Sequence, residues 1–303
     1  MNWKKYSSQT KIFSFLILFA LASNLSSDIE DNIALHKEQF SEVALKIWEY
    51  AELGYQETKS SNLLASELEK EGFKITKGVA GIPTAFVAEF GSSGPVIGIL
   101  GEFDALPGLA QTNSPFKEVA INDSGGGHAC GHHLFGAASA WAAVSIKEWL
   151  VENDIEGTVR FYGTPAEEGG SGKVYMVREG LFDDVDVVLH WHPDDVNSAN
   201  PKTSNSNKSA KFTFKGISAH AAGSPELGRS ALDGVEAMNM MVNLMREHIP
   251  QESRMHYVIT KGGLAPNVVP DLAEVYYYVR HPEMKVVEEL FQRVVKTAEG
   301  AAR

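Results

Sequence analysis

Apolar residues recur at helical spacing in two segments near the start of the chain. Residues 31–51 carry them three and four positions apart, as at Phe40, Val43 and Ile47, and residues 60–70 repeat the pattern. An amphipathic helix buries a stripe of this kind against a core. Both segments are therefore predicted to be helices.

Short apolar runs rich in β-branched residues follow the two helical segments. The runs span residues 84–90, 95–100, 158–162 and 185–190, and turn residues bound them. An alanine-rich helical pattern at about 136–150 separates the first two runs from the last two. Continuous apolar strands that alternate with helices indicate a buried, mainly parallel sheet of the α/β class. Sites in such sheets gather beyond the carboxyl ends of the strands.

The pattern changes over residues 194–208, where polar residues, proline and lysine replace the periodicity. Beyond this linker the pattern predicts strands at 210–215, 255–261 and 272–279. It predicts helices at about 229–248 and from 283. This β-α-β-β-α order lacks only a last strand to complete an α+β ferredoxin-like unit. We therefore expect a first domain over residues 23–208 and a second over 209–303.

Composition supports a folded protein and excludes some function classes. The chain has 303 residues, with 44% hydrophobic and 22% charged, which is usual for globular proteins of about two domains. A net charge of −12 argues against nucleic acid as a partner, because phosphate binding needs a basic surface. A single cysteine excludes an intrachain disulfide.

The first 22 residues have the layout of a secretory signal peptide. Lys4, Lys5 and Lys11 precede an apolar stretch over 12–22, which ends in the small-x-small sequence Ala-Leu-Ala. The stretch is shorter than the roughly 20 residues that span a bilayer, so we expect no permanent membrane anchor. The sequence thus predicts a secreted or periplasmic protein.

Three short motifs carry side chains that bind divalent metals. Cys130 lies near His132, Glu167 adjoins Glu168, and His192 follows the last apolar run. Thiolate, imidazole and carboxylate together suit zinc, manganese or a similar ion. A serine hydrolase is the competing enzyme class, but the chain has no Gly-x-Ser-x-Gly elbow.

Two further histidines are less clear from the sequence. Strand alternation would point His190 away from His192, so His190 is interpreted as structural. His128 either supports the metal ligands or belongs only to a loop, and both interpretations stay open.

Five motifs in order resemble the dinuclear metallopeptidases of family M20. They are Trp-Glu-Tyr-Ala-Glu-Leu-Gly-Tyr-Gln-Glu (48–57), Glu-Phe-Asp-Ala-Leu-Pro-Gly (102–108), His-Ala-Cys-Gly-His (128–132), Pro-Ala-Glu-Glu-Gly (165–169) and His-Trp-His-Pro (190–193). The cysteine motif looks like the amidohydrolase branch, which includes hippurate, indole-acetyl-amino-acid and aminobenzoyl-glutamate hydrolases, and it is most similar to the last. Segments 216–222, 228–234 and 267–270 resemble the family's lid and dimerisation domain.

The resemblance implies a role for each matching residue. Cys130 would bridge two metal ions, His132, His192 and Glu168 would complete the ligands, and Glu167 would be the general base. The remaining roles fall on Asp104, which would orient a ligating histidine, on His220, which would stabilise the oxyanion, and on Asn267 and Arg280, which would contact the substrate.

The implied protein is a metal-dependent amidohydrolase with two divalent ions, zinc or manganese. It would cleave N-acyl or N-aroyl amino acids or small dipeptides and would form a homodimer through its lid. A catalytically silent binding module that dimerises through the same lid is the alternative.

Two departures from the family pattern accompany the resemblance. His133 stands where an acid or amide usually follows Cys-Gly-His. The family's last histidine ligand has no counterpart before Arg303, so a C-terminally truncated chain is expected.

Overall fold

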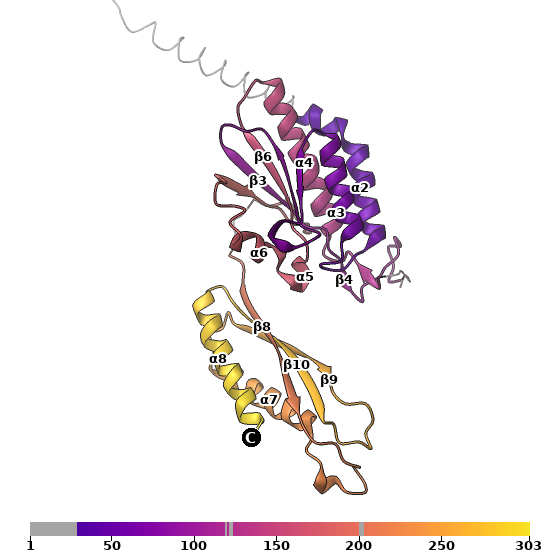
Figure 1. The fold of residues 1–303 in the computed structure, drawn as a ribbon, viewed down its shortest axis with the longest axis vertical. Helices are drawn as coiled ribbons and strands as arrows, with labels where there is room; N and C mark the ends of the chain where they lie inside the picture. The colour runs from indigo at the N-terminus through magenta and orange to yellow at the C-terminus, as the bar shows by residue number, and fades with distance from the viewer. Residues whose placement is uncertain (1–28, 119, 121–123, 200–202) are drawn as a thin grey trace, which may run out of the picture. The chain divides into compact units, whose positions relative to one another are not determined.

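The structure is a computed structural model that describes residues 29–118, 120, 124–199 and 203–303. It divides into two compact units that meet between Asn197 and Ser198 (Figure 1). The boundary expected after Lys208 falls inside the first strand of the second unit. The expected signal peptide lies outside the described residues. Within the described ranges, every helix is too short or too polar to cross a bilayer.

A five-stranded sheet forms the centre of the first unit (Figure 1). Its strands, in spatial order, are β1 (Lys74–Lys77), β2 (Phe86–Phe90), β6 (Thr158–Gly163), β3 (Val96–Gly101) and β7 (Val187–Leu189). The pairs β1–β2 and β2–β6 are antiparallel, whereas β3 runs parallel to both β6 and β7. The α/β class is confirmed with a mixed sheet, in which parallel pairing is confined to the three strands that lead to the candidate site.

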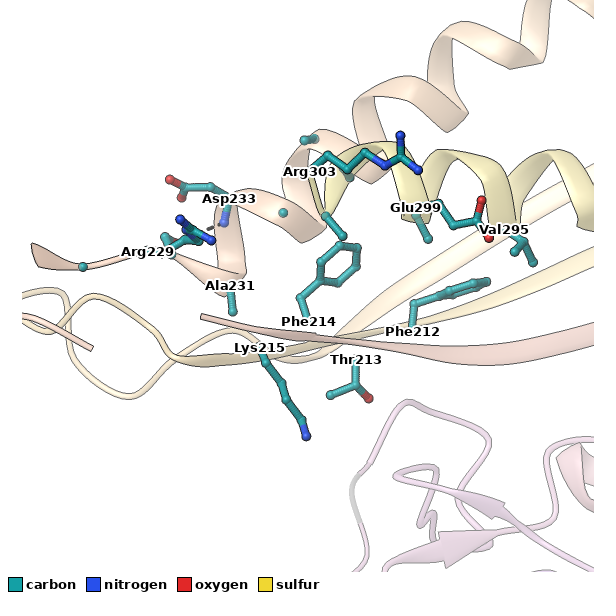
Figure 2. Close-up of a pocket in the computed structure, with 17 residues that line it drawn as sticks. Phe212, Thr213, Phe214, Lys215, Arg229, Ala231, Asp233, Val295, Glu299 and Arg303 are labelled. Carbon is teal, nitrogen blue, oxygen red and sulfur yellow. Dashed lines mark hydrogen bonds between the residues drawn. The ribbon is translucent and has the colours of Figure 1, made fainter. Parts of the chain in front are cut away.

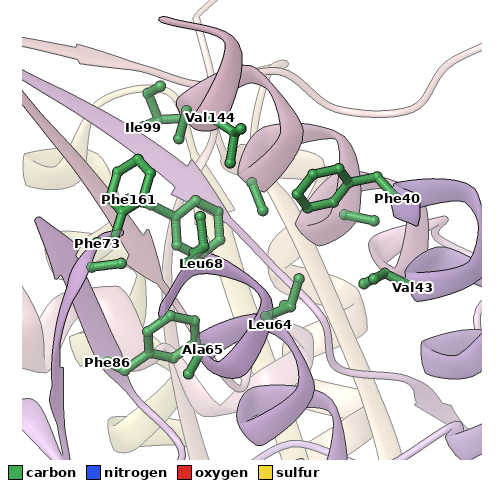
Figure 3. Packing of buried hydrophobic residues seen from close by; sticks show 14 of the residues in the cluster. Phe40, Val43, Leu64, Ala65, Leu68, Phe73, Phe86, Ile99, Val144 and Phe161 are labelled. Atoms are coloured by element: carbon green, nitrogen blue, oxygen red, sulfur yellow. The ribbon is translucent and has the colours of Figure 1, made fainter. Parts of the chain in front are cut away.

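Helices α3 (Thr58–Lys70) and α4 (His132–Glu152) cover one face of this sheet, and α2 (Lys37–Tyr50) packs against both of them. Their apolar stripes meet the strands in a single buried cluster that includes Phe40, Leu64, Phe86, Val144 and Phe161 (Figure 3). Burying each such aromatic or aliphatic side chain contributes roughly 1.5–3 kcal/mol. This core holds the ends of β3 and β6 in fixed positions.

The opposite face of the sheet carries a smaller apolar cluster. Tyr162, next to Phe161 in β6, points there and packs with Ile82 and with Met176 of α6 (Gly172–Arg178). The short elements of the unit are the 3₁₀ turn η1 (Val79–Gly81), strands β4 (Leu106–Pro107) and β5 (Gly126–Gly127), and the irregular turn α5 (Glu167–Gly170). The fold thus anchors α6 close to the end of β6.

Helix α4 begins at His132, four residues before the predicted start. The residue before it, Gly131, adopts a left-handed conformation with φ of +78°, which glycine tolerates without the penalty that a Cβ brings. The alanine-rich pattern begins only at Gly136, so periodicity alone missed the first turn. The consequence is that His132 lies in the rigid first turn of a long helix.

The second unit is a three-stranded antiparallel sheet covered by two helices. The strands, in the order β8 (Ser206–Lys215), β10 (Leu272–His281) and β9 (Arg254–Lys261), pack against α7 (Ala231–Met245) and α8 (Met284–Ala301). The 3₁₀ turns η2 (Pro225–Leu227) and η3 (Arg246–His248) flank α7. Val235, Met238, Tyr277 and Val294 lie in its core. The predicted β-α-β-β-α order is confirmed.

A hollow of about 980 Å³ lies in the second unit beside β8 (Figure 2). Phe212 and Phe214 form part of its wall, and Arg229, Asp233 and Glu299 lie around them. None of the clusters of metal-binding donors among the described residues includes a residue of this hollow. Chemistry therefore identifies the candidate site more clearly than volume does.

Candidate metal centre

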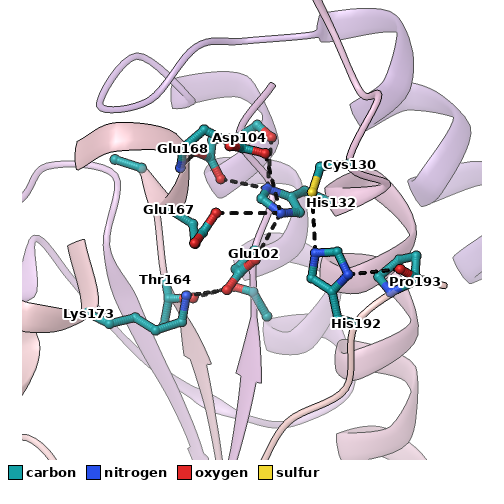
Figure 4. A network of polar contacts seen from close by, with 12 residues as sticks. Glu102, Asp104, Cys130, His132, Thr164, Glu167, Glu168, Lys173, His192 and Pro193 are labelled. Carbon is teal, nitrogen blue, oxygen red and sulfur yellow. Dashed lines mark hydrogen bonds and ion pairs between the residues drawn. The ribbon is translucent and has the colours of Figure 1, made fainter. Parts of the chain in front are cut away.

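The candidate metal ligands converge at the carboxyl ends of the three parallel strands (Figure 4). Asp104 follows β3, Glu167 and Glu168 form the turn after β6, and His192 follows β7. Cys130 and His132 join them from the start of α4. Parallel strands end at one edge of a sheet, which is why segments distant in sequence meet there.

His132 is fully buried and is oriented by Asp104. Its Nδ1–H donates to Oδ1 of Asp104 at 2.9 Å and lies 3.1 Å from the Asp104 carbonyl oxygen. Burial opposes charge on the ring, yet the hydrogen bond with Asp104 and the carboxylate of Glu102, 3.0 Å from Nε2, raise the pKa of His132 to about 10. In the neutral ring the proton on Nδ1 leaves the Nε2 lone pair available to a metal.

Cys130 and His192 form the second part of the cluster. The Cys130 Sγ lies 3.4 Å from Nε2 of His192, whose Nδ1–H donates to the Pro193 carbonyl at 2.8 Å. Donor atoms of Cys130, His132 and His192 all lie within 4.8 Å of one another. Burial and the neighbouring Glu168 raise the pKa of the Cys130 thiol to about 12. A thiolate here therefore needs a cation beside it.

The Glu-Glu turn is irregular. Glu168 and Gly169 depart from helical geometry, and Ala166 and Ser171, on either side of the turn, have left-handed φ angles of 57° and 58°. Buried Glu57 accepts the Ala166 N–H at 2.8 Å and so fixes the entry to the turn. The turn lets two adjacent carboxylates face the same site.

Glu167 and Glu168 both approach Nε2 of His132, at 4.0 and 3.9 Å. The Glu168 N–H donates to Oδ2 of Asp104 at 2.8 Å, which ties this turn to the end of β3. The Glu167 side chain is 47% exposed, whereas that of Glu168 is 19% exposed. Burial and the nearby carboxylates of Glu102 and Glu168 raise the pKa of Glu167. Exposure and a raised pKa suit Glu167 to proton transfer.

The donor set fits a divalent ion. Among the described residues, Nε2 of His132 and Oε2 of Glu102 are buried polar atoms that lie 3.0 Å apart and have no hydrogen-bond partner other than each other. Buried polar atoms normally have a partner, because leaving one unpaired costs about 1–3 kcal/mol. A cation between these donors would satisfy both.

Two residues of the site had little or no signal in the sequence. Glu102 follows a strand, but its motif gave it no role, and Lys173 belongs to no motif, although its Nζ contacts Oε1 of Glu102. His132 and Lys173 hold the pKa of Glu102 at about 2 in spite of the burial that opposes its charge. Only the folded arrangement brings α6 to the end of β3.

His128 and His190 lie outside the donor clusters found among the described residues. The His128 Nε2–H donates to the Ile47 carbonyl at 3.0 Å, and burial together with His133 lowers the pKa of His128 to about 4. The His190 ring packs edge-on against Phe135. Their contacts indicate structural roles for both histidines.

Another cluster of donors lies on the helices, away from the strand ends. It comprises His36, Glu71 and Glu148, and the Lys147 Nζ lies 3.8 Å from Oε2 of Glu71 and 3.9 Å from Oε1 of Glu148. The ammonium group already supplies positive charge there. This cluster is therefore an ion-pair network between helices.

In the second unit, His220 and Asn267 come together. His220 forms an isolated antiparallel β-bridge with Val268, and the Ala221 N–H donates to the Asn267 carbonyl at 3.0 Å. The His220 Nδ1 accepts the N–H groups of Ala222 and Gly223 at 3.2 and 3.0 Å. In the neutral ring the proton must then lie on Nε2, so exposed His220 can act as a hydrogen-bond donor.

Arg280 lies at the opposite end of strand β10 from this pair. The His220 segment adjoins the start of β10, where the Gly216 N–H donates to the Asp271 carbonyl at 2.8 Å. The nine residues from Leu272 to Arg280 extend about 27 Å in a strand, because eight steps of about 3.4 Å separate the first from the last. Within one copy of this unit, Arg280 is therefore far from His220 and Asn267, although all three were expected to contact one small substrate.

Comparison with known proteins gives consistent matches. The peptidase dimerisation domain of the M20 class matches residues 203–303. The chain is 48% identical over 275 residues to a subunit of the p-aminobenzoyl-glutamate hydrolase of Escherichia coli (strain K12), covering 90% of this chain and 57% of that protein. It is 30% identical to the IAA-amino acid hydrolase ILR1-like 5 of Arabidopsis thaliana, covering 94% of this chain and 69% of that protein.

Solved structures share the fold. A dinuclear metal-binding peptidase of the M20 family from Bacillus subtilis is 25% identical, with a TM-score of 0.57 over 89% of this chain and 70% of that one. An aminobenzoyl-glutamate utilization protein from Klebsiella pneumoniae has a TM-score of 0.63 at 19% identity, over 90% of this chain and 74% of that one. The chain spans less than two thirds of the E. coli relative's length.

Proposed function

Because this chain belongs to the M20 peptidase family, we propose that the protein is a metal-dependent amidohydrolase. Its substrate is an N-aroyl or N-acyl amino acid of the p-aminobenzoyl-glutamate kind, or a small dipeptide. The observation that carries the proposal is the convergence of thiol, imidazole and carboxylate donors at the strand ends, with donor atoms of Cys130, His132 and His192 within 4.8 Å of one another.

The chain's own residues account for the proton transfers of amide hydrolysis. Glu167, partly exposed and with a raised pKa, accepts the proton of the attacking water and returns it to the leaving amine. Cys130, His132, His192 and Glu168 would hold the ions, and Asp104 keeps Nε2 of His132 available. When bound, two divalent ions supply Lewis-acid polarisation of the carbonyl and lower the pKa of water.

Zinc and manganese are the ions that we propose for the centre. Thiolate and imidazole favour zinc, whereas several carboxylates favour manganese, and the site offers both kinds of donor. Titration of the metal-free protein with each ion separates these two possibilities.

We propose that a second copy of the chain completes each site. The start of β10, which adjoins the segment of His220 and Asn267, lies about 27 Å along the strand from Arg280, a span that no N-aroyl amino acid covers. If all three contact the substrate, His220 and Asn267 must come from one copy and Arg280 from the other. Donation from His220 Nε2 then stabilises the oxyanion.

The surface that we propose for this homodimer is the outer edge of β9 with the neighbouring face of α7. Met240 and Leu244 of α7 and Val258 and Ile259 of β9 are exposed and apolar, and β9 is an edge strand of the described sheet. Exposed apolar edges tend to pair with another chain. The E. coli relative is itself named as one subunit of its enzyme.

The silent binding module remains the second hypothesis. A chain that only dimerises has no need of the exposed Glu167 beside the donor cluster. Turnover of p-aminobenzoyl-glutamate or hippurate distinguishes the two hypotheses.

Export is a further part of the proposal. It rests on the lysines and the apolar stretch within residues 1–22. N-terminal sequencing of the mature protein should find a new end after Ala22. An intact Met1 would contradict export by cleavage.

The direct test of the function is hydrolysis of p-aminobenzoyl-glutamate and hippurate by the full-length protein. Activity should disappear when a chelator removes the metal and return when zinc or manganese is added back. Activity that survives complete metal removal would contradict the proposal.

A further inference from the structure

Glu102 has the least explained environment at the metal centre. It follows β3 directly, its side chain is 4% exposed, and its Oε2 lies 3.0 Å from Nε2 of His132 (Figure 4). Apart from each other, neither atom has a hydrogen-bond partner among the described residues. Because Asp104 already takes the Nδ1 proton of His132, the neutral ring turns a lone pair toward the carboxylate.

Two facing lone pairs need something positive between them. A proton can satisfy the pair when no ion is bound, and a metal ion can satisfy it when one is. Donors bound to one ion at about 2.0–2.2 Å can lie no more than about 4.4 Å apart. The 3.0 Å from His132 to Glu102 and the 4.0 Å from His132 to Glu167 both meet this limit. The three side chains form one donor group.

Lys173 determines which oxygen of Glu102 is available. Its Nζ, on the second residue of α6, contacts Oε1 and leaves Oε2 to face His132. A ligating carboxylate is usually hydrogen-bonded through its other oxygen, which fixes its orientation. The ammonium group fills that role here without competing for the ion.

We propose that Glu102 is an additional ligand of the metal centre. Its Oε2 binds the ion that His132 binds through Nε2, and Lys173 is a positioning residue that holds the carboxylate in place. The inference rests on the proposed function but adds a ligand outside the set that the family motifs supply.

Metal titration of the full-length, metal-free protein tests the inference. Wild type, Glu102→Gln and Lys173→Met are titrated with Zn²⁺ and with Mn²⁺ by calorimetry. Loss of an outer partner costs about 10- to 100-fold in metal affinity, so Lys173→Met should weaken one of two binding events by that factor. Glu102→Gln should weaken the same event at least as much. Lys173→Arg, which keeps the charge, should restore most of the affinity.

A matched pair on α3 provides the control. Lys70 and Glu67 are joined at 2.7 Å between Nζ and Oε1, away from the centre. Glu67→Gln and Lys70→Met should leave both binding events unchanged. The absorption spectrum of the Co²⁺-loaded protein adds a readout of ligation, because a lost ligand alters it and a change in packing elsewhere does not. Glu102→Gln should change this spectrum.

The outcomes separate the two proposals. A wild-type protein that binds no ion would overturn the proposed function. A wild type that binds two ions, with the same affinities and Co²⁺ spectrum in Glu102→Gln, would overturn the role of Glu102 alone. If Glu102→Gln does not fold, Lys173→Met decides, and unchanged binding in that variant overturns the inference.

Discussion

At the residue scale, the position of one proton organises the candidate centre. Asp104 accepts the Nδ1 proton of His132 through Oδ1 and the N–H of Glu168 through Oδ2. One carboxylate therefore orients a ligand and also anchors the Glu-Glu turn. His132 and Glu168 lie 28 and 64 positions from Asp104 along the chain. The sequence motifs suggested the contact with His132, but only the folded structure reveals the contact with Glu168.

The two carboxylates of the turn should respond differently to the same substitution. Glu167→Gln should keep both metal ions and lose about 10²- to 10⁴-fold in kcat, because it removes a general base. Glu168→Gln should lose metal first, because Glu168 is the less exposed carboxylate beside Cys130. Metal analysis and steady-state kinetics on both variants check the assignment. The reverse pattern would exchange the two roles.

Cys130→Ser should lower metal content and activity together. The Cys130 pKa of about 12 shows that burial and Glu168 disfavour a negative charge unless a cation is bound. A serine hydroxyl holds its proton far more firmly than a thiol, so it bridges two ions poorly. Elemental analysis of the purified variant measures the loss. Full metal occupancy in Cys130→Ser would remove Cys130 from the ligands.

At the element scale, the turn at Gly131 sets the distance between ligands. It has a φ of +78° between Cys130 and His132, and a Cβ placed there would lie 2.9 Å from the Pro193 side chain. Gly131→Ala should therefore cost more than the roughly 1–2 kcal/mol of left-handed strain alone, and it should weaken metal binding by pushing His192 away.

Gly72→Ala is the matched control for that substitution. Gly72 has a φ of +86°, and an added Cβ would meet no described atom within 4 Å. It should show the strain without the clash, so its melting temperature should fall less and its metal affinity should stay unchanged. Equal effects of the two substitutions on metal binding would contradict this role of the turn.

Helices and strands whose apolar pattern continues over many residues could be predicted from the sequence, but the residues at which they begin and end could not. The strands near β3 and β6 and the β-α-β-β-α order of the second unit follow from periodicity alone. The start of α4 depends on the backbone of Gly131, and the antiparallel place of β2 beside β6 depends on tertiary pairing. Neither the start of α4 nor the pairing of β2 with β6 can be predicted from the pattern of apolar residues.

The site was predictable where a motif carried chemistry and not elsewhere. Cys130, His132 and His192 meet as the motifs indicated. Lys173 reaches the site only because α6 packs near the end of β6, so no local signal could identify it. The distance between His220 and Arg280 likewise appears only when β10 is seen as one continuous strand.

At the scale of the whole molecule, the two units differ in charge. The first unit, with 28 acidic and 14 basic residues, has a net charge of −14, whereas the second, with 11 acidic and 13 basic residues, has a net charge of +2. The second unit holds His220 and Arg280, the side chains proposed to donate hydrogen bonds to an anionic substrate. Metal binding and proton transfer are proposed for residues of the first unit, and substrate contacts for residues of the second units of two copies.

Mixing two inactive variants tests the shared site. His220→Ala and Glu167→Gln should each be nearly inactive alone. If each site takes His220 from one copy and Glu167 from the other, co-refolded mixtures should regain about a quarter of wild-type activity, since half of the dimers are mixed and each has one intact site. No recovery in mixed dimers, verified by differential tags, would place both residues in one copy.

Every role proposed for the catalytic residues depends on a dinuclear metal centre at the strand ends of the first unit. The number of ions bound per chain by full-length wild type and by His132→Ala measures this directly, by native mass spectrometry during titration with Zn²⁺ and Mn²⁺. We expect two ions in wild type and one or none in His132→Ala. Two ions bound equally well by His132→Ala would contradict the dinuclear centre.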